Sequence, residues 1–399
     1  MLVPPAVFPC RPAAPGQDGS VILRTVGVEE ELLLVDPHTG HPCALSSEVL
    51  ARLAKCAAAG GGASRETFAG ELQGQQLEFG TRPQTDMDEL GAEILRWRRE
   101  AARHALEAGA AVAALATSPL PAQPAINVSH RYQWMEKQFG LTTQEQLTCG
   151  CHVHVSAASD DEGVAVVDRI QPWLPVLTAL SGNSPYWQGN DTLYSSYRSR
   201  VWGRWPMSGP TGVFGSAERY HAQVDSMVTS GVVRDRGMIY FDARLSHRYP
   251  TVEIRVADVC LEATTTLLVA CLGRALVETA ARDWRAGRPP LTHGVQLLRL
   301  AAWRAARSGL EGDLLHPLTM RPAPAPTVVR ALFDHVREAL EDSGDLVWAR
   351  KTTAELLAHG NGALVQRALF ARTGSLSSVV AACVRRTVGE RELRYMTPE

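Results

Sequence analysis

Lysine is scarce in this chain, which carries only Lys55, Lys137 and Lys351 beside its many arginines. A nucleotide-binding loop of the Walker type needs a Gly-Lys-Ser or Gly-Lys-Thr triplet, and the sequence contains none. If the protein handles phosphate, it must therefore do so with arginine and a metal ion. Arginine suits that task because its planar guanidinium binds two phosphate oxygens at once.

Long apolar runs and a targeting segment are also missing. No apolar stretch approaches the ~20 residues that cross a bilayer, and residues 1–20 lack the charged start and the apolar core of a secretory signal. The eight cysteines show no CxxC spacing, so we interpret them as reduced thiols of a cytoplasmic protein. The net charge of −2 gives no broad attraction to nucleic acid or to an anionic membrane. We expect neither as a partner.

The chain is long enough, at 399 residues, to bury a large core. No repeat or clear linker divides it. We expect a flexible N-terminal segment over 1–20, one domain over 21–385 and a C-terminal tail over 386–399. Separated strands followed by clustered helices indicate an α+β fold rather than a regular βαβ array. The patterning predicts helices over residues 46–58, 85–110, 161–181, 261–284, 293–309, 326–342 and 350–358.

Three consecutive carboxylates, Glu29, Glu30 and Glu31, stand in an apolar run that predicts a strand. Because alternate side chains of a strand point to opposite faces, Glu29 and Glu31 share one face and Glu30 takes the other. Buried like charges repel and are costly to desolvate, and a divalent cation such as Mg2+, which prefers oxygen ligands, relieves both costs. The alternative is a solvated acidic edge strand, which fits poorly beside so apolar a flank.

A second acidic pair lies in a run from Phe68 to Phe79 that we expect to be extended and that contains Glu71 and Glu78. Their odd spacing puts them on opposite faces of a regular strand. A bulge or bend at Gly74 would restore a common side. Without it, only one of the two can join a shared site. An ordinary exposed strand is the alternative.

Two histidines occupy alternate positions of a further strand, in the segment Cys149-Gly-Cys151-His152-Val-His154. By the same parity His152 and His154 share one face, and we expect the two cysteines to face the opposite, packed side. A single buried histidine is usually a hydrogen-bonded core residue. A pair at this spacing suits a metal site, and zinc hydrolases use the pattern too.

A fourth strand, Thr251–Val259, carries Glu253 and Arg255 on one face. The two side chains could form a simple ion pair. Alternatively, Glu253 is a metal ligand and Arg255 binds a phosphate or a carboxylate.

A long irregular segment, residues 182–215, interleaves Arg198, Arg200 and Arg204 with tryptophan and tyrosine. Loops of that length inside a domain are usually functional. Arginine among aromatic rings could bind single-stranded nucleic acid. It could equally clamp phosphates and a substrate carboxylate beside a metal. The acidic strands nearby favour the second interpretation, because they would repel nucleic acid.

Together these segments resemble one family, the ATP-dependent carboxylate–amine ligases related to glutamate–cysteine ligase type 2. The matching segments are GVEEELLLVD, ELQGQQLEF, CGCHVHV, NSPYWQG followed by SYRSRVWGRWP, and TVEIRVAD. They appear in the family order between about Thr25 and Arg367. Five motifs in order are far more specific than any one of them alone.

The resemblance implies a glutamine synthetase-like catalytic core, in which a curved, mostly antiparallel sheet forms a funnel with helices packed on its outer face. It also implies ATP and Mg2+ as cofactors, with Mn2+ as a substitute. The metal ligands that it implies are Glu29, Glu31, Glu71, Glu78, His152 and Glu253. His154 falls at a neighbouring position whose role is less fixed.

The same resemblance assigns the arginines to phosphate and substrate. The residues expected at the cofactor are Arg198, Arg200, Arg204 and Arg255, and those expected to act in catalysis are Arg198, Arg200 and Arg255. Which of them binds phosphate and which binds the substrate carboxylate stays open. No lysine of the Walker type is needed.

The implied reaction transfers the γ-phosphoryl group of ATP to a substrate carboxylate, and an amine then displaces phosphate from the acyl phosphate. Positioning and charge neutralisation carry such a reaction, without a protein nucleophile. The expected partners are a small glutamate-like carboxylate and an amine, cysteine or another amino acid, with glutamate–cysteine activity weak or incidental. Related proteins suggest a homodimer.

Three other functions compete with this one. A zinc hydrolase could use His152 and His154, but it leaves Glu29, Glu31 and Glu253 unexplained. A guanidino kinase would share the metal and ATP chemistry and phosphorylate nitrogen instead. A binding protein that has lost activity would not be expected to keep every ligand type.

Overall fold

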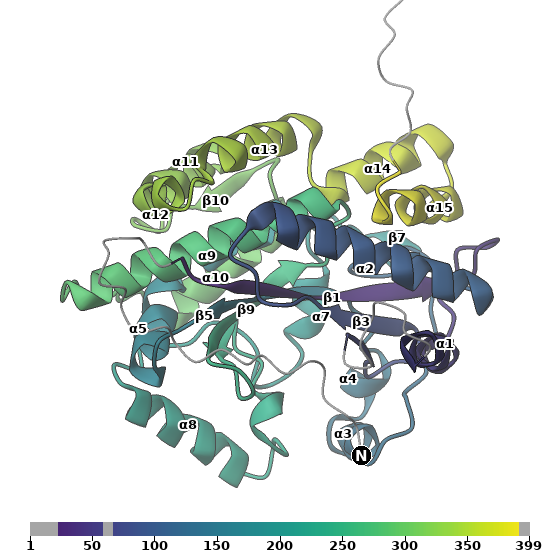
Figure 1. Cartoon of the computed structure of the whole chain (residues 1–399), viewed down its shortest axis with the longest axis horizontal. Coiled ribbons are helices and arrows are strands. Elements are labelled where there is room, and N and C mark those ends of the chain that lie inside the picture. The colour runs from purple at the N-terminus through teal and green to yellow at the C-terminus, as the bar shows by residue number, and fades with distance from the viewer. Residues whose placement is uncertain (1–22, 59–66, 391–399) are drawn as a thin grey trace, which may run out of the picture.

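A seven-stranded sheet forms the centre of the molecule (Figure 1). The structure is a computed structural model and describes residues 23–58 and 67–390. The strand order is β2-β3-β1-β5-β9-β8, and β4 pairs with one end of β1. Every pairing between these strands is antiparallel. The strands are β1 (Val26–Val35), β2 (Phe68–Gly70), β3 (Gln76–Gly80), β4 (Ala111–Ala113), β5 (Gly150–Ser156), β8 (Ala243–Leu245) and β9 (Thr251–Asp258). The α+β fold with an antiparallel sheet is therefore confirmed.

One face of the sheet is covered by two long helices, α2 (Met87–Glu107) and α9 (Ala263–Arg285), drawn above the strands in Figure 1. An ion pair lies in this layer, where Arg98 of α2 binds Glu30 of β1 and both side chains are fully buried. Thr266 of α9 donates a further hydrogen bond of 2.6 Å to Glu30 Oε1. Glu30 thus points away from Glu29 and Glu31, as the strand parity predicts.

Helix α9 has no continuous apolar run near ~20 residues, since Arg274 and Glu278 interrupt it. Among the described residues it is nevertheless the one helix long and apolar enough to cross a membrane by length and composition alone. Its most apolar part is 78% buried inside the protein. The helix is apolar because it packs on β1, β5 and β9 from inside the fold.

Further helices form an outer layer on the α9 side and a separate group below the sheet (Figure 1). Those on the α9 side include α11 (Ala325–His335), α12 (Arg337–Asp342), α13 (Leu346–His359), α14 (Gly362–Thr373) and α15 (Leu376–Thr387). The other helices are α1 (Ser46–Ala58), α3 (His130–Phe139), α4 (Leu141–Gln144), α5 (Asp160–Ile170), α6 (Leu174–Ser181), α7 (Arg198–Trp202), α8 (Ala217–Thr229) and the single 3-10 turn η1 (Arg236–Met238), whereas α10 (Val295–Ser308) packs on α6 and α7. Two small hairpins, β6 (Tyr186–Trp187) with β7 (Asn190–Asp191) and β10 (Asp313–Leu315) with β11 (Pro322–Pro324), complete the described chain.

The single helix expected over 161–181 is wrong, because the structure has two helices there. Pro172 lies in the turn between α5 and α6, where its missing N–H and its ring end the first helix. Pro175 is tolerated because it stands in the first turn of α6. The helix expected over 326–342 is likewise divided at Val336.

The two expected terminal segments, 1–20 and 386–399, are described to different extents. The N-terminal segment 1–20 lies outside the described residues. At the other end α15 runs to Thr387, whose side chain is fully buried and accepts a hydrogen bond from the N–H of Ala114. The packed chain therefore extends past residue 386, where the tail was expected to begin.

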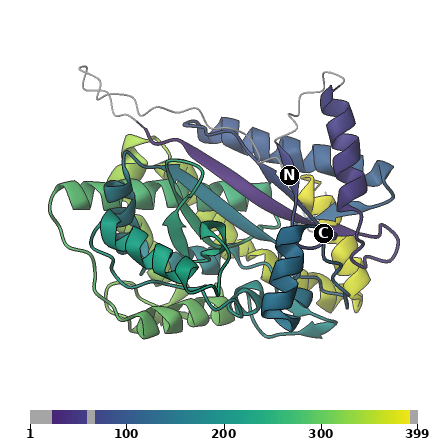
Figure 2. The same ribbon diagram turned by 90° about the horizontal axis from the view of Figure 1, so that it is seen from below.

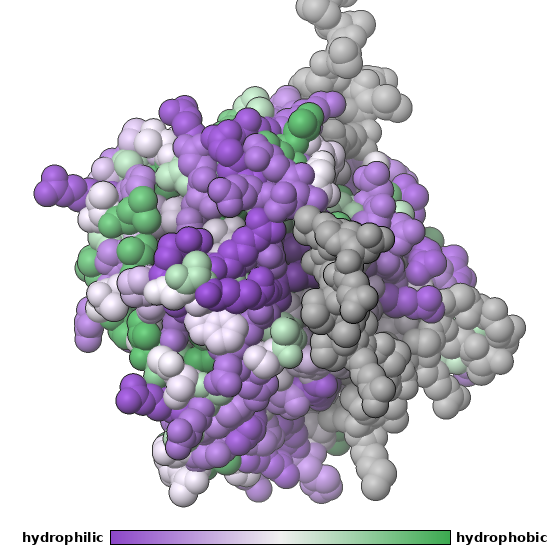
Figure 3. Space-filling view, turned by 60° about the vertical axis from the view of Figure 1, so that its left-hand side comes forward, coloured by the Kyte–Doolittle hydropathy of each residue, from purple (hydrophilic) through white to green (hydrophobic). Residues whose placement is uncertain are grey.

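The sheet is long and twisted, with β1 running diagonally across the molecule beside β5 (Figure 2). On the face seen in Figure 3 polar side chains predominate and apolar ones form small groups. Most large apolar side chains of the described residues are buried in one continuous core around the sheet and its helices.

Candidate active site

A cavity of about 730 Å³ opens on the face of the sheet opposite α2 and α9. Five strands, β1, β3, β5, β8 and β9, place ionisable side chains in its wall, and α3 and η1 close its sides. The strand residues expected at the site that line it are Glu29, Glu78, His152, His154, Glu253 and Arg255, together with Glu71 from the turn after β2. The sheet thus brings segments that are up to 226 positions apart, Glu29 and Arg255, into one wall.

Strand pairing explains why the acidic and histidine strands meet. Glu29 on β1 lies opposite His152 on β5, and Glu31 lies opposite Glu78 on β3. Glu31 also accepts a hydrogen bond of 2.6 Å from the backbone N–H of Gly150. Glu29 and Glu31 of β1 therefore lie between β3 on one side and β5 on the other.

The run from Phe68 to Phe79 is a hairpin and not one extended strand, which corrects our prediction. β2 and β3 are antiparallel, and Ala69 lies opposite Glu78. The chain reverses between them, so Glu71 and Glu78 line the same cavity despite their odd spacing. The chain reverses through the turn at Gly74 and Gln75, so the bend considered at Gly74, rather than a bulge, gives them a common side.

Both histidines approach the same carboxylate. His152 Nδ1 lies 3.5 Å and His154 Nε2 lies 3.4 Å from Glu29 Oε2. His154 Nδ1 also lies 3.1 Å from the hydroxyl of Thr251. The Nε2 atoms of His152 and His154 are buried without a hydrogen-bond partner. His152 thus keeps one buried ring nitrogen free for a ligand.

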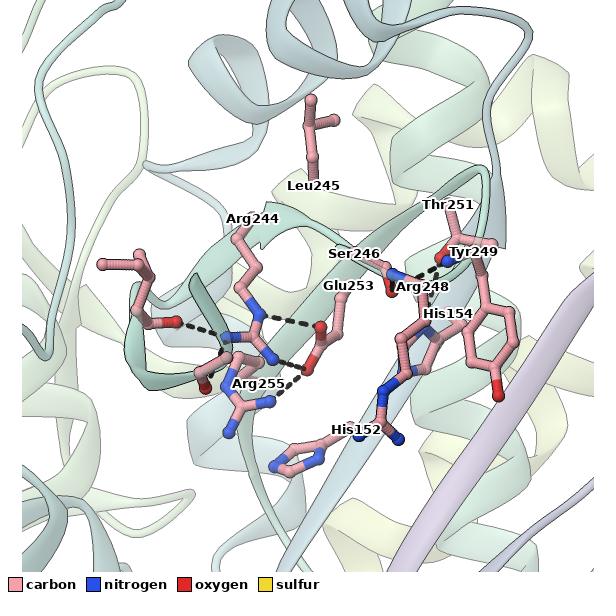
Figure 4. Close-up of polar contacts among 12 residues, drawn as sticks. His152, His154, Arg244, Leu245, Ser246, Arg248, Tyr249, Thr251, Glu253 and Arg255 are labelled. Atoms are coloured by element: carbon pink, nitrogen blue, oxygen red, sulfur yellow. Dashed lines mark hydrogen bonds and ion pairs between the residues drawn. The ribbon is translucent and has the colours of Figure 1, made fainter. Parts of the chain in front are cut away.

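Glu253 holds two arginines, as the close-up in Figure 4 shows. Arg244 on β8 binds it through two hydrogen bonds of 2.8 and 3.1 Å, and Arg255 forms a second ion pair with it. The ion pair weighed for Glu253 and Arg255 is therefore present. Sequence reasoning missed Arg244, although its place opposite Glu253 in the β8–β9 pair is what aligns it. A short strand with one arginine carries no distinctive pattern.

Burial and mutual repulsion set the protonation of the carboxylates. Burial, followed by the charge of Glu71, raises the pKa of Glu31 to about 7. Burial also raises the pKa of Glu71, and burial with the charges of its neighbours raises that of Glu78 well above its usual range. For Glu253 burial acts in the same direction, but Arg244 and Arg255 outweigh it and lower its pKa. A metal-free site therefore holds protons on several of these groups.

The same residues fit divalent metal ions. Ligand atoms of Glu29, His152 and Glu253 lie within 4.8 Å of one another, and so do those of Glu31, Glu78 and His152. Oxygen donors with one imidazole suit Mg2+ or Mn2+. The two groups share His152, whose Nε2 has no partner, and together they account for the acids gathered here, although Glu31 lies behind the lining of the cavity.

Burial and the charge of Arg255 lower the pKa of His152 to about 4. The imidazole is therefore neutral at physiological pH, the state that a metal ligand requires. Burial lowers the pKa of His154, but the charge and hydrogen bond of Glu29 together with the charge of Glu253 outweigh it, so the pKa moves upward. The two histidines thus differ in character, and His152 is the better ligand.

A second cavity of about 420 Å³ adjoins the first, and the two share Trp202, Trp205 and Arg255 in their walls. Arg198 and Arg200 line this second cavity. Arg198 is buried, and its Nη2 donates a 3.4 Å hydrogen bond to the carbonyl of Arg255. Arg198 and Arg200 therefore line the second cavity, on the far side of Arg255 from the carboxylates.

Arg204 lies elsewhere. It forms an ion pair of 2.6 Å with Glu145, and it lines neither cavity. An unexpected acid, Asp242, does line the second cavity, and burial raises its pKa to about 7. Asp242 follows no motif that sequence reasoning could have used.

The further histidines that a zinc hydrolase would need are mostly remote. His221 pairs with Asp160 at 2.8 Å, His293 lies 3.0 Å from a backbone carbonyl, and His316 lines neither cavity. Only His247 of this group borders the carboxylate cavity. The two histidines of β5 therefore stand in a wall made mainly of acids and arginines.

Solved structures with the same fold are ligases. Glutamate–cysteine ligase from Francisella tularensis, in complex with AMP, matches with a TM-score of 0.68 at 14% identity, over 92% of this chain and 89% of that one. The ligase PafA, solved with the ubiquitin-like protein Pup, matches with a TM-score of 0.52 at 13% identity, over 89% and 69%. At such identities the likeness establishes the fold, an antiparallel sheet of the glutamate–cysteine ligase type.

Sequence relatives define the family. A model described as "Glutamate-cysteine ligase family 2(GCS2)" matches residues 25–382. The chain is 66% identical to "Putative glutamate--cysteine ligase 2-1" of Streptomyces avermitilis, over 92% of this chain and 100% of that protein. It is 64% identical to "Putative glutamate--cysteine ligase 2" of Streptomyces coelicolor, over 92% and 99%. The chain belongs to glutamate–cysteine ligase family 2 and is an enzyme of the ATP-dependent carbon–nitrogen ligase class.

Proposed function

We propose that this protein joins a carboxylate to an amine through an acyl-phosphate intermediate, with ATP and Mg2+ as cofactors. The observation that carries the proposal is the shared wall in which two metal-sized ligand groups meet Arg255. AMP in the related Francisella structure supports the use of an adenine nucleotide. Glutamate with cysteine is the reference substrate pair, and we expect that activity to be weak.

The acids and His152 would hold the metal ions. Glu31 and Glu78 with His152 form one ligand group, and Glu29 and Glu253 with His152 form the other. Glu71 adjoins Glu78 and completes the acidic side of the cavity. Bound Mg2+ would neutralise phosphate charge and orient the phosphoryl group for in-line transfer.

The arginines would hold the anions between which the phosphoryl group moves. Arg255 stands where the two cavities join, so its guanidinium can reach a phosphate in one and a carboxylate in the other. Arg198 and Arg200 would bind the substrate carboxylate in the second cavity. Arg204, engaged by Glu145, stays outside this scheme.

The second cavity suits an amino acid as the carboxylate substrate. It contains Asp242, which can bind an ammonium group, beside the arginines that can bind a carboxylate. Three tryptophans, Trp202, Trp205 and Trp303, supply apolar surface around them. A small aminocarboxylate is therefore the class of substrate that we propose.

Product analysis with purified protein, Mg2+ and ATP tests the reaction. Phosphate release should require both a carboxylate and an amine, and hydroxylamine in place of the amine should give a hydroxamate from the acyl phosphate. Glu29→Gln should abolish both signals. A panel of amino acids that yields no amine-dependent phosphate would refute the ligase reaction, and a stable phosphorylated guanidine would favour a kinase instead. The homodimer and the cytoplasmic location stay predictions, to be checked by light scattering and by cell fractionation.

A further inference from the structure

A second group of metal-ligating side chains lies away from both cavities, where helix α1 packs against α2. It consists of Cys56 on α1 and of Glu100 and His104 on α2. One ligand atom from each lies within 4.8 Å of the other two. None of the three lines either cavity of the active site. Figure 1 shows α1 at one side of the molecule, near an end of α2.

A cationic nitrogen already occupies the centre of this group. Nη2 of Arg103 lies 2.6 Å from Glu100 Oε1, 2.6 Å from His104 Nε2 and 3.8 Å from Cys56 Sγ. The three ligand atoms therefore converge on one point, and a positive group stands there. The Arg103 side chain is 49% exposed, so it can turn out to solvent and leave that point to another cation.

The histidine is oriented as a metal ligand requires. His104 is 3% exposed, so its ring is fixed inside the protein. His104 Nε2 lies 2.6 Å from Nη2 of Arg103 and 3.1 Å from Oε1 of Glu100, so this ring nitrogen faces the centre of the group. Nδ1 has no hydrogen-bond partner, and its nearest charged neighbour, a carboxylate oxygen of Glu107, lies 3.6 Å away. A carboxylate behind the outer ring nitrogen is the usual support of a metal-bound histidine.

We propose that Cys56, Glu100 and His104 bind a zinc ion that ties α1 to α2. A thiolate, an imidazole and a carboxylate are the three ligand types that zinc takes in proteins. Glu100 and His104 are four positions apart on one helix, so both reach the ion from the same face. Water completes the tetrahedron. Binding forms the Zn–S bond as the Cys56 thiol gives its proton to the solvent, and Arg103 is displaced.

Cobalt distinguishes this site from the active site, because only this one offers a thiolate. Full-length protein stripped of metal should bind Co2+ with a sulfur-to-cobalt charge-transfer band, and one equivalent of Zn2+ should remove it. Cys56→Ser and His104→Gln should lose the band. Cys43→Ser, a half-buried cysteine outside the group, and His152→Ala, in the active site, should both keep it.

The role of Arg103 gives an independent test. Arg103→Ala should bind Zn2+ at least about tenfold more tightly than the wild type, because the competing guanidinium is gone. Zinc should also raise the melting temperature of the wild type more than that of Cys56→Ser, whose own fold is checked by circular dichroism. A wild type and an Arg103→Ala variant that both lack the cobalt band would overturn the proposal and leave the group as an anchor for Arg103.

Discussion

Arg98 donates two hydrogen bonds of 2.7 Å to Glu30 on the helix-covered face of the sheet. Glu30 stands between Glu29 and Glu31, whose side chains point to the active site on the other face. Glu30→Gln leaves the Arg98 charge buried without its partner. We expect it to lower the free energy of unfolding by about 3–5 kcal/mol. Glu29→Gln should cost less, because Glu29 is 23% exposed and its partners are two histidines at 3.4 and 3.5 Å rather than a fully buried arginine, and it should reduce turnover at least about 100-fold.

Urea denaturation and steady-state phosphate release on the two variants measure the contrast. The neighbours differ by one position and carry the same substitution, so each is the control of the other. Full activity in Glu29→Gln, or unchanged stability in Glu30→Gln, would contradict the assignment of the two faces.

Gly150 has no room for a side chain, since an added Cβ would lie 2.3 Å from Nη2 of Arg198. Gly150→Ala should therefore push Arg198 from its place beside the second cavity and raise the KM for the carboxylate substrate by at least about tenfold. Gly212→Ala, whose nearest neighbour would be 3.8 Å away, serves as the matched control. Equal KM values for the two variants would show that Arg198 does not touch the substrate.

Substitution of Arg204 and of Arg255 by alanine should affect turnover very differently. Arg204 makes a part-exposed ion pair with Glu145, so Arg204→Ala should change stability by less than about 1 kcal/mol and turnover by less than about twofold. Arg255→Ala should reduce kcat at least about 100-fold, since it stands where the cavities meet. Steady-state kinetics with ATP and carboxylate varied in turn would decide the matter. A large loss in Arg204→Ala would place it back at the substrate.

The metal-free protein should become less stable as the pH rises from about 4.5 to 7. The pKa of Glu31 is raised from 4.5 to about 7, so in this window the folded state holds a proton that the unfolded state has lost. Stability then falls with rising pH. The share of Glu31 is up to about 3 kcal/mol and is lost above pH 7, and the raised pKa of Asp242 acts in the same direction. Saturating Mg2+ should flatten the dependence, because it takes the place of the protons.

Chemical denaturation at several pH values, once with EDTA and once with Mg2+, measures how the free energy of unfolding depends on pH. Glu31→Gln should remove the share of Glu31 in the metal-free protein and leave that of Asp242, whose pKa is also raised to about 7. A slope unchanged by both Mg2+ and Glu31→Gln would mean that other groups set it.

Strand parity correctly predicted that Glu29 and Glu31 face one side of the sheet and Glu30 the other. Side chains alternate between the two faces along any regular strand, so this prediction needs no knowledge of the fold. Parity failed for Glu71 and Glu78, since it counts only within one strand and the chain reverses between them. A single helix over 161–181 was predicted despite Pro172 and Pro175, because apolar residues continue through the turn at Pro172.

Residues joined only by tertiary contact could not be predicted. Arg244 reaches Glu253 because β8 and β9 pair, and Asp242 enters the second cavity because the chain bends just before β8. Neither belongs to a pattern of spacing. Arg204 shows the opposite error, since it shares a motif with Arg198 and Arg200 but points to Glu145.

The strand order delays folding of the sheet during synthesis of the chain. The central strands β1, β5 and β9 are separated by long stretches of chain, and the last of them is complete only at Asp258. At synthesis rates of about 5–20 residues per second, β1 waits on the order of 10 to 40 s for the whole centre of its sheet. Through that interval β1 can pair with β3, β4 and β5, but the sheet lacks β8 and β9 and Glu29 lacks Glu253. We therefore expect refolding to be slow, limited by distant strand pairing, and the nascent chain to depend on chaperones until β9 has emerged.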